Sequence, residues 1–507
     1  MRGDILIKSL ISEGLAELIP LELMERLLKL DIKGIAYDSR KVKKDYIFVA
    51  YKGFKLGDSI SNSALKYIEP AMEKGAKVLV VEEPLPKTFN LAEGVETILV
   101  KDGRKAMAIL SRDFYDNPAK KLKMVGITGT YGKTTSTFLL KSIYEAAGLK
   151  TGLIGTIKYT GGKEEMEAYN TTPEAPELQS VLADFVEEET KVCVMEVSSH
   201  SLELNRVYGM DFDVAGFTTL ERDHLDFHET VEKYAEAKLK LFKGLKKDKI
   251  AVLNKDSSVF KQYSSQTEAK VLSYGSETKD YNVRGEILKA DLNGLEIKVV
   301  WDIPKGFPLS GKGEGTIYSP LVGPHNLMNI LLVTGCAFAD GIEFDVISEG
   351  IKNLKVVPGR FDIINRVIVD YAHTPGALEA ALRSARAITV GRLICIFGCG
   401  GDRDHGKRPL MGNVASENAD YVILTTDNPR SEDPKKIIED IISGINKCNY
   451  EVILDRETAI KHAVERSSPE DVIMVVGKGH ENYQLLGELK MPWDEKAVIK
   501  EALGRKK

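Results

Sequence analysis

Short, uninterrupted runs of β-branched and other apolar residues recur along this 507-residue chain, each followed by a longer stretch of helical periodicity. This alternation constrains the fold more than any other feature. Helices cover both faces of a parallel sheet, so its strands are buried on both sides and read as continuous apolar runs. The pattern therefore predicts an α/β fold built on parallel sheets, and the length requires more than one domain.

The runs group into three blocks, which we predict to be three successive α/β domains. The first block, residues 1–103, carries strand candidates at 45–53 and 77–83, with a helical stretch near 64–74 between them. We expect this block to form a small α/β domain.

The second block, residues 104–357, and the third, residues 358–507, repeat the strand–helix rhythm. Strand candidates lie at residues 124–128, 191–197, 213–219 and 249–254, and then at 366–372, 392–398, 421–426 and 471–477. Residues 281–318 instead alternate between apolar and polar side chains, which predicts antiparallel strands appended to the second sheet.

Charge and hydropathy exclude several classes of protein. Lys and Arg number 70 against 75 Asp and Glu, for a net charge of −5, so nothing points to nucleic acid. No run approaches the roughly 20 apolar residues that span a bilayer, and residues 1–20 lack the apolar core of a signal peptide. Cys395 and Cys399 are the only closely spaced cysteines, and no histidine set completes a zinc pattern. We expect a cytoplasmic protein with reduced thiols and no membrane partner.

The sharpest local signal is VGITGTYGKTTST at residues 125–137. A strand candidate runs into a glycine-rich turn, which leads to a helix. Gly129 and Gly132 allow backbone amides to curl around phosphate oxygens, and the start of the helix adds positive potential. Lys133 would neutralise the β- and γ-phosphates, and the Thr134 hydroxyl would ligate magnesium.

One position departs from the usual phosphate-loop pattern, because Ile127 stands where a first glycine is common. The order of strand, loop, GKTT and helix still favours a phosphate loop over a chance turn. Glu196 ends the apolar run at 191–197. Such an acid is more often only a solvated strand end, but together with the phosphate loop it predicts a second magnesium-binding element.

The polar segment that follows is dense in potential metal ligands, namely Asp223, His224, Asp226 and His228. Zinc is one interpretation, but spaced histidines in one loop more often cap helices or donate hydrogen bonds. The next helix candidate places Tyr234 and Lys238 on one face, four residues apart. From the residues alone, Lys238 would be a surface lysine.

Together these segments resemble the Mur ligases, the enzymes that build the cell-wall peptide stem one residue at a time. The matching motifs are DSR (38–40), GTYGKTT (129–135), NTTPE (170–174), EVSSH (196–200), RDHLDFH (222–228), PGR (358–360), DYAHTP (370–375), GCGGDRDHGKRPLMG (398–412), DNPR (427–430) and GKGHE (477–481). The resemblance implies a nucleotide-sugar-binding N-terminal domain, a central P-loop ATPase-like domain with a parallel sheet and a Rossmann-like C-terminal domain.

The resemblance also implies ATP and Mg²⁺ as cofactors. The catalytic set would be Lys133, Lys238, Glu196 and His224. The residues around ATP would be Gly129, Thr130, Tyr131, Gly132, Lys133, Thr134, Thr135, Asn326, Arg360, Asp370 and His373. Magnesium would be held by Thr134, Glu196, His224 and Lys238, with Lys238 carbamylated, because a carbamate is an anionic oxygen ligand and an ammonium is not. Tyr131 stands where the family commonly has asparagine.

By the same resemblance, the partners are UDP-N-acetylmuramoyl-L-Ala-D-Glu and meso-2,6-diaminopimelate. Ser39 would touch the uridine end, and Asn170, Thr171, Thr172, Ser198 and Arg206 the muramoyl-dipeptide. The residues around the incoming amino acid would be Arg403, Asp427, Asn428, Pro429, Arg430, Gly477 and Glu481. The arginine of DNPR is typical of members that use diaminopimelate, whose second carboxylate suits a guanidinium fork.

The implied reaction is an ATP-dependent amide ligation through an acyl phosphate, in peptidoglycan precursor synthesis and hence in cell shape and division. We expect a monomer. Alternatives are the same ligase with L-lysine or another amino acid, a divergent paralogue, a folylpolyglutamate synthetase or a pseudomurein peptide ligase. DNPR together with GGDRD argues against the folate enzyme. A phosphate-loop switch or ATP-dependent binding protein would need a base-recognition motif or a transducing domain, and the sequence has neither.

Overall fold

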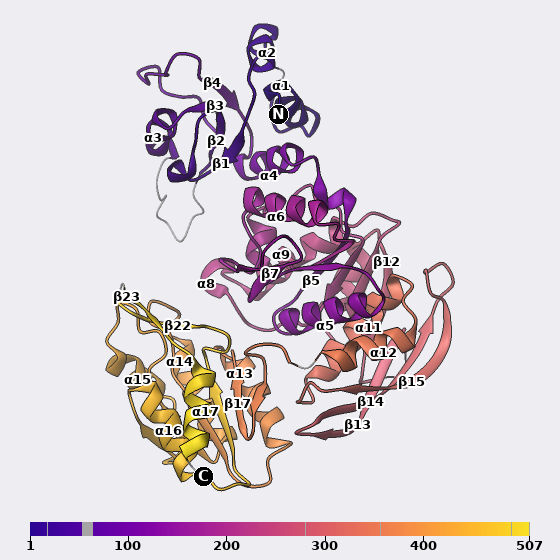
Figure 1. Cartoon of the computed structure of the whole chain (residues 1–507), viewed down its shortest axis with the longest axis vertical. Coiled ribbons are helices and arrows are strands. Elements are labelled where there is room, and N and C mark those ends of the chain that lie inside the picture. Colours follow the sequence, from indigo (N-terminus) through magenta and orange to yellow (C-terminus); the bar gives the residue numbers. More distant parts are fainter. Residues whose placement is uncertain (18, 53–63, 279, 355, 488, 506–507) are drawn as a thin grey trace.

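The computed structural model describes residues 1–17, 19–52, 64–278, 280–354, 356–487 and 489–505. Three sheets follow one another along the chain, each flanked by helices (Figure 1). The central sheet lies between the other two units, and the C-terminal unit folds back towards the same side as helix α8 (Leu225–His228) (Figure 1). The predicted three-part α/β architecture is confirmed.

The first sheet is wholly parallel, in the order β1-β2-β3-β4. Its strands are β1 (Gly34–Ala36), β2 (Tyr46–Ala50), β3 (Ala76–Val81) and β4 (Glu96–Leu99), and its helical segments are α1 (Gly3–Ser12), α2 (Leu21–Leu28), η1 (Ser39–Lys41), η2 (Ala64–Tyr67), α3 (Ile68–Glu73) and α4 (Gly103–Phe114). Helices α1 and α4 bury their apolar faces in one core with this sheet. The predicted boundary at residue 103 coincides with the start of α4, and the domain limits stay a proposal.

The central sheet has eleven strands within the described residues, in the order β15-β14-β13-β12-β11-β10-β5-β9-β6-β7-β8. The strands are β5 (Lys123–Thr128), β6 (Thr151–Ile154), β7 (Lys158–Thr160), β8 (Met166–Glu167), β9 (Val192–Glu196), β10 (Val214–Phe217), β11 (Ile250–Asn254), β12 (Lys270–Gly275), β13 (Val283–Asp291), β14 (Gly294–Ile303) and β15 (Gly311–Ser319). In this order, the neighbouring strands from β13 to β6 pair in parallel. The edge strands β7 and β8 are antiparallel. Strands β13, β14 and β15 are antiparallel too, as the alternating pattern predicted.

Helices cover both faces of the central sheet, and one apolar core lies on each side of the sheet. They are η3 (Pro118–Lys121), α5 (Lys133–Ala146), α6 (Ala175–Glu187), α7 (Ser199–Glu203), α8, α9 (Val231–Lys243), α10 (Phe260–Gln266), α11 (Asn326–Ala339) and α12 (Phe344–Asn353). Helix α11 is apolar on nearly every side because it is enclosed between the sheet, α5 and α12.

The C-terminal sheet has the order β16-β17-β21-β18-β19-β20, parallel except for β16. Its elements are β16 (Asp362–Ile364), β17 (Val367–Asp370), α13 (Pro375–Arg386), β18 (Leu393–Phe397), α14 (Lys407–Asn418), β19 (Tyr421–Leu424), α15 (Pro434–Ile442), β20 (Tyr450–Val452), α16 (Arg456–Arg466), β21 (Val472–Val476) and α17 (Glu495–Arg505), with a separate hairpin of β22 (Tyr483–Leu486) and β23 (Leu489–Pro492). All four strand candidates of this block are confirmed.

The strand order sets where functional loops can meet. Strands β10, β5 and β9 are adjacent in the central sheet, and β17, β21, β18 and β19 are adjacent in the C-terminal sheet. Because parallel strands end at the same edge, the loops after each group lie together. Each sheet therefore offers one edge at which a site can form.

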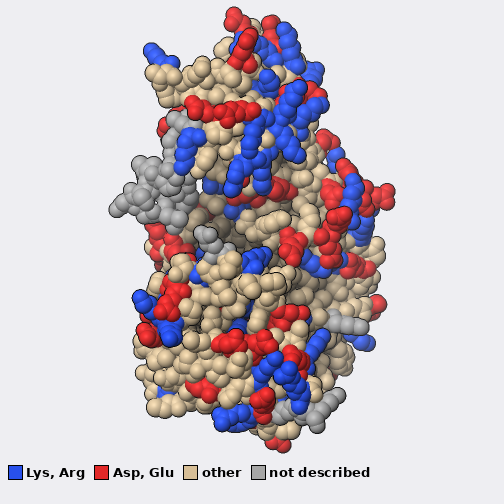
Figure 2. Space-filling view, turned by 60° about the vertical axis from the view of Figure 1, so that its left-hand side comes forward, with Lys and Arg blue, Asp and Glu red and all other residues tan. Residues whose placement is uncertain are grey.

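The surface carries both signs of charge side by side over the face shown in Figure 2. In the described part of the chain, no helix is both long and apolar enough to cross a bilayer. All five cysteines are free thiols, four of them buried.

A buried ion pair holds α16 to α17 in the C-terminal domain. The guanidinium of Arg456 donates to both carboxylate oxygens of Glu495, at 2.7 and 3.0 Å, and to the carbonyl of Val476 at 3.0 Å. Neither side chain of the pair is more than 2% exposed. Removing one member would leave the other charge buried without compensation.

We therefore predict that Arg456→Met lowers the unfolding free energy of this domain by about 3–5 kcal/mol. Arg456→Met combined with Glu495→Leu should recover most of the loss. Arg505→Met, which breaks a solvent-exposed pair with Glu501 in the same helix, should cost less than about 0.5 kcal/mol. Urea unfolding followed by tryptophan fluorescence measures all three; equal losses for Arg456→Met and Arg505→Met would contradict the prediction.

Candidate active site

The phosphate loop, residues 129–135, joins β5 to α5 at the edge of the central sheet. Gly129 and Gly132 have φ of 143° and 82°, which side chains rarely adopt. A Cβ on Gly129 would lie 1.8 Å from Thr218 Oγ1, and one on Gly132 would lie 2.3 Å from Asn329 Oδ1. Both positions therefore require glycine, for conformation and for space.

Two lysine side chains converge on this loop. Lys133 Nζ donates to the carbonyl oxygens of Gly129 and Thr130, both at 2.8 Å. Lys238 Nζ, from α9, donates to the same Gly129 oxygen at 2.8 Å and lies 4.2 Å from the centre of the Tyr234 ring. Lys238 is 1% exposed, so the structure places it in the site and not on the surface.

Burial lowers the pKa of both lysines. For Lys238 the pKa falls well below its usual value, first through burial and then through the charge of Lys133. For Lys133, burial is partly opposed by the carboxylates of Glu196 and Asp223. A lowered pKa makes the neutral amine of Lys238 available, and only a neutral amine is nucleophilic.

Glu196 ends β9 beside the phosphate loop, as the sequence predicted. Its carboxylate accepts hydrogen bonds from the hydroxyls of Thr134 and Thr156, each at 3.1 Å, and from the Thr156 amide at 2.8 Å. A threonine hydroxyl next to a carboxylate at a phosphate loop is the donor set that magnesium takes beside nucleotide phosphates. Thr156 belongs to no motif that the sequence analysis recognised.

His224 precedes α8 in the left-handed conformation, with φ of 52°. Its ring lies edge-on to His200, 4.8 Å between centroids, and His200 lies 5.5 Å from His228. Burial lowers the pKa of all three, to about 3 for His200 and about 4 for His228. The imidazoles are therefore neutral and keep a lone pair for ligation.

Within the described ranges, no three His, Cys, Asp or Glu side chains are grouped so as to hold a metal ion by themselves. The residues nevertheless fit magnesium, because this ion keeps several waters and takes nucleotide phosphates in place of a full protein cage. The pairing of Thr134 with Glu196 would supply two of its oxygen ligands.

A cavity of about 900 Å³ extends from the phosphate loop to the C-terminal domain. Two hydrogen bonds cross it: Tyr131 Oη with Thr374 Oγ1 at 2.8 Å, and Arg360 Nη2 to Thr134 Oγ1 at 3.3 Å. Asp370 and His373 also line this cavity. Burial lowers the pKa of His373 to about 4, so its ring is neutral.

Asn326, at the start of α11, does not line the cavity. It is 3% exposed, and its amide donates to the Val322 carbonyl at 2.9 Å. Asn329, one turn later, donates to Asn326 Oδ1 at 3.0 Å and lines the cavity beside Gly132. Helical spacing of three residues was the available signal for Asn329.

The predicted dipeptide residues gather on the other side of Glu196. Thr172 Oγ1 donates to the Glu196 carbonyl at 2.8 Å and accepts from the Ser198 amide at 3.1 Å. Arg206 donates to the Thr172 carbonyl at 2.8 Å and pairs with Glu174 at 2.7 Å. Asn170, Thr171, Ser198 and Arg206 all line the same cavity. Ser39 lies apart from them on η1, buried in the first domain.

The predicted amino-acid residues lie at the edge of the C-terminal sheet, after β18, β19 and β21. Asn428 Nδ2 donates to Glu481 Oε2 at 2.8 Å. Arg430 Nη1 donates to the Gly401 carbonyl at 2.7 Å. The backbone of Arg430 has the left-handed conformation, with φ of 50°. Asp427 and Asn428 are buried, Pro429 adjoins them, and Gly477 has φ of 110°. Arg403 is exposed on the loop after β18.

Lys478 occupies the centre of this group, and the sequence analysis assigned it no role although it is part of GKGHE. Its Nζ donates to Asn428 Oδ1 at 2.9 Å and lies 3.4 Å from the carboxylates of both Asp427 and Glu481. The central domain reaches this region through Glu167, which accepts a hydrogen bond from Asn482 at 3.1 Å.

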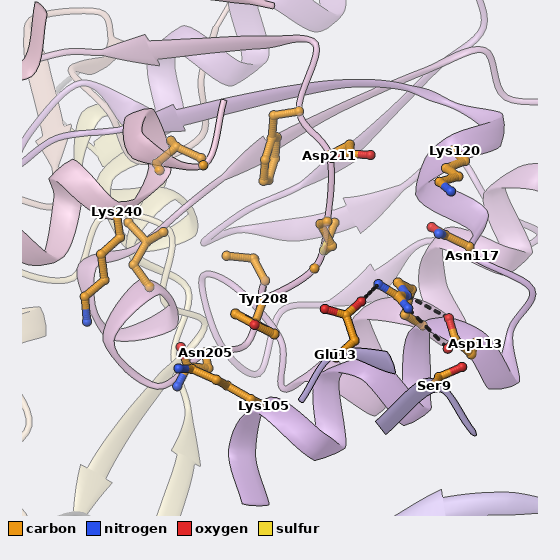
Figure 3. A pocket seen from close by; sticks show the side chains of 18 of the residues that line it. Ser9, Glu13, Lys105, Asp113, Asn117, Lys120, Asn205, Tyr208, Asp211 and Lys240 are labelled. Carbon is orange, nitrogen blue, oxygen red and sulfur yellow. Dashed lines mark hydrogen bonds and ion pairs between the residues drawn. The ribbon is translucent and has the colours of Figure 1, made fainter. Parts of the chain in front are cut away.

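A second cavity, of about 1150 Å³, lies between the first and central domains (Figure 3). Arg112 pairs there with Glu13 at 3.1 Å and with Asp113 at 2.7 Å, drawn as dashed lines in Figure 3. None of the residues predicted to bind ATP, magnesium or substrate lines it. Its charged groups are largely paired with one another.

The comparisons with known proteins agree with this geometry. Three family models match: "Mur ligase family, catalytic domain" over residues 31–115, "Mur ligase middle domain" over 127–337 and "Mur ligase, glutamate ligase domain" over 359–479. The chain belongs to the Mur ligase family, whose members are ATP-dependent ligases.

Two curated relatives that match nearly the whole chain carry the same name. The UDP-N-acetylmuramoyl-L-alanyl-D-glutamate--2,6-diaminopimelate ligase of Clostridium botulinum is 43% identical over 94% of this chain and 96% of its own length. The ligase of that name from Bacillus cereus is 40% identical over 93% and 94%. A solved structure of such a ligase is 30% identical with a TM-score of 0.64, covering 94% of this chain and 96% of its own. The MurF ligase of Thermotoga maritima, solved with ADP, shares the fold at 18% identity and a TM-score of 0.60, covering 94% and 97%.

The tight fit of Gly132 yields a matched test of the phosphate loop. Gly132→Ala places a side chain on a residue with left-handed backbone conformation, and its Cβ collides with Asn329. Gly148→Ala adds one at φ of 77° with nothing within 4 Å. We predict that Gly132→Ala weakens ADP binding about tenfold or more, because it displaces the amides that face phosphate.

Gly148→Ala should introduce only the strain of a left-handed backbone conformation, and it should bind ADP with the affinity of the parent protein. Titration calorimetry with ADP and magnesium measures the affinities, and thermal unfolding checks that both variants are folded. Equal affinity in the two variants would exclude the loop as the phosphate site.

Proposed function

We propose that this chain joins meso-2,6-diaminopimelate to the D-glutamate of UDP-N-acetylmuramoyl-L-Ala-D-Glu, with ATP, magnesium and an acyl-phosphate intermediate. The observation that carries the proposal is the loop 427–430, whose arginine lies beside the acidic and amide groups of the same sheet edge. A Cβ on Gly400 would lie 3.0 Å from Arg430 Nη1 and 3.8 Å from Arg403 Cγ, so both arginines flank one glycine. The relatives named for this activity support it.

The first half-reaction brings two anions together. The D-glutamate side-chain carboxylate attacks the γ-phosphorus of ATP, and ADP leaves. Lys133 lies where it can neutralise the phosphates, and Arg360 reaches Thr134 from the C-terminal domain. Fixed cations offset the repulsion between carboxylate and triphosphate, which water would otherwise screen. Magnesium, held by Thr134, Glu196, His224 and a carbamate on Lys238, would supply further positive charge.

The second half-reaction needs a neutral amine beside the acyl phosphate. The amine attacks the carbonyl carbon and phosphate leaves with its bonding electrons. The guanidinium groups of Arg403 and Arg430 would hold the distal carboxylate of the amino acid. The carboxylates of Asp427 and Glu481 would hold an ammonium group of the same amino acid. Hydrogen bonds across the cavity, such as that between Tyr131 and Thr374, draw the domains together and help to keep water from the intermediate.

We also propose that the enzyme acts in the cytoplasm as a monomer. ATP and nucleotide-linked sugars are substrates of that compartment, and the absence of a bilayer-crossing helix among the described residues is compatible with it. Sedimentation of the purified chain tests the monomer.

Phosphate release with ATP, magnesium and the UDP-linked dipeptide tests the reaction itself, with diaminopimelate and L-lysine offered in parallel. Turnover with diaminopimelate and little with lysine is expected. Preference for lysine would support an amide ligase but contradict the role proposed for Arg430. Failure with both would reject the proposed acceptor.

We predict that Arg430→Met raises KM for diaminopimelate about 10–100-fold, because charge-assisted hydrogen bonds to one carboxylate are lost. KM for ATP should stay unchanged. The control is Arg386→Met, which removes a surface arginine of the same domain from its pair with Asp420. An equal effect of both variants on KM would contradict the assignment.

A second prediction concerns Lys238. Its neutral amine adds to CO₂, forming an N–C bond and releasing a proton, which leaves a carbamate anion. Removing CO₂ and bicarbonate should lower kcat about tenfold or more, and bicarbonate should restore it. Lys238→Ala should be inactive without regard to bicarbonate and partly rescued by short carboxylates. Full activity of the CO₂-free enzyme would exclude a carbamate.

A further inference from the structure

Lys478 is a fully buried cation near the proposed amino-acid site. It directly follows Gly477, at the carboxyl end of β21, and its side chain is 0% exposed. Its Nζ donates to Asn428 Oδ1 and to the Tyr483 carbonyl, both at 2.9 Å. A buried ammonium is costly unless it is paired, so its contacts define what it does.

The first consequence concerns the side-chain amide of Asn428. Its Oδ1 accepts from Lys478 and from the Leu485 amide at 2.9 Å. Lysine is only a donor, so the amide oxygen must face it. The amide nitrogen is thereby directed to Glu481, to which it donates at 2.8 Å. Lys478 thus determines which way Asn428 points and where the Glu481 carboxylate lies.

The second consequence concerns charge. The carboxylates of Asp427 and Glu481 both lie 3.4 Å from Lys478 Nζ. Asp427 Oδ1 is buried and accepts no hydrogen bond from any described residue. Two carboxylates so close together repel one another, and the ammonium between them offsets that repulsion.

Burial raises the pKa of Glu481, and the charge of Lys478 acts in the opposite direction. Asp427 raises the pKa of Glu481 further, while the Asn428 amide lowers it. The other ionisable groups whose charges interact with Glu481 are Tyr371, Arg456 and Tyr483.

We propose that Lys478 is a positioning residue that determines acceptor specificity: it holds Asp427, Asn428 and Glu481 in one orientation, with its ammonium between the two carboxylates, to receive an ammonium group of the incoming amino acid. The proposal rests on the proposed function and extends it to a residue that does not itself touch the ligand. The ammonium of Lys478 would then act on the choice of a zwitterionic amino acid from behind the residues that contact it.

Two substitutions separate hydrogen bonding from charge. Lys478→Gln keeps a donor for Asn428 and Tyr483 and loses the charge, whereas Lys478→Met loses both. KM and kcat for diaminopimelate are measured as a function of pH, together with KM for ATP. Lys436→Met, at an exposed lysine of α15, is the matched control.

For Lys478→Gln we expect KM for diaminopimelate to rise about tenfold near neutral pH, with kcat and KM for ATP little changed. Without the ammonium, Glu481 takes up a proton at higher pH, so the loss of affinity on acidification should begin at higher pH than in the parent. Lys478→Met should show a larger rise. If the Met variant does not fold, the Gln variant carries the test.

The double variant Lys478→Gln with Glu481→Gln tests whether Lys478 acts through Glu481. In the Glu481→Gln background, Lys478→Gln should no longer shift the pH dependence of KM. An unchanged KM and pH profile in Lys478→Gln, or a parallel rise in KM for ATP, would overturn the proposal. A parent enzyme that turns over lysine but not diaminopimelate would reject the proposed function instead, and the same pH series with lysine then tests Lys478.

Discussion

The carbonyl oxygen of Gly129 accepts hydrogen bonds from the side-chain nitrogens of Lys133 and Lys238, each at 2.8 Å, and much of the site is arranged around this pair of lysines. The two amino groups lie so close because the glycine loop leaves room for them and because burial favours the neutral form of Lys238. The arrangement suits a polyanionic ligand. It also explains why burial of Lys238 matters: the charge of Lys133 further disfavours a second ammonium there.

Contacts to the phosphate loop also connect the central and C-terminal domains. Arg360, from the C-terminal domain, donates to Thr134 at 3.3 Å, so a guanidinium approaches the phosphate loop from outside the sheet that carries it. Tyr131, at the position where the sequence departs from the family's asparagine, bonds to Thr374 of the other domain at 2.8 Å. An unusual loop residue thus serves as a contact between domains.

Features that depend on local periodicity were predictable from the sequence. The buried runs became parallel strands, the alternating segment 281–318 became antiparallel strands, and Glu196 lies beside Thr134 because adjacent parallel strands end at one edge. The roles of His224, Lys238 and Arg430 came from resemblance, since nothing local distinguishes them from surface residues. The placements of Lys238 at 1% exposure and of His224 in a left-handed turn emerge only in three dimensions.

Other residues gave no readable signal. Thr156 meets Glu196 through strand order alone, and Lys478 could not be told from a solvated lysine until its four polar neighbours were in place. Helical spacing indicated that Asn326 and Asn329 are neighbours, but sequence did not reveal that Asn329 is the one of the two that lines the cavity. Packing between elements decided each of these cases.

The separation of the two sheet edges has an evolutionary consequence. The residues proposed to bind phosphate belong mainly to loops of the central sheet, whereas the residues proposed to bind the amino acid belong to loops of the C-terminal sheet. If these roles hold, a change of acceptor needs replacement of a few loop residues after β18, β19 and β21. Ligases as distant as 15–18% identity keep this fold at TM-scores of 0.59–0.62. On this arrangement, a change at the C-terminal edge would alter the amino acid that is bound and leave the loop between β5 and α5 as it is.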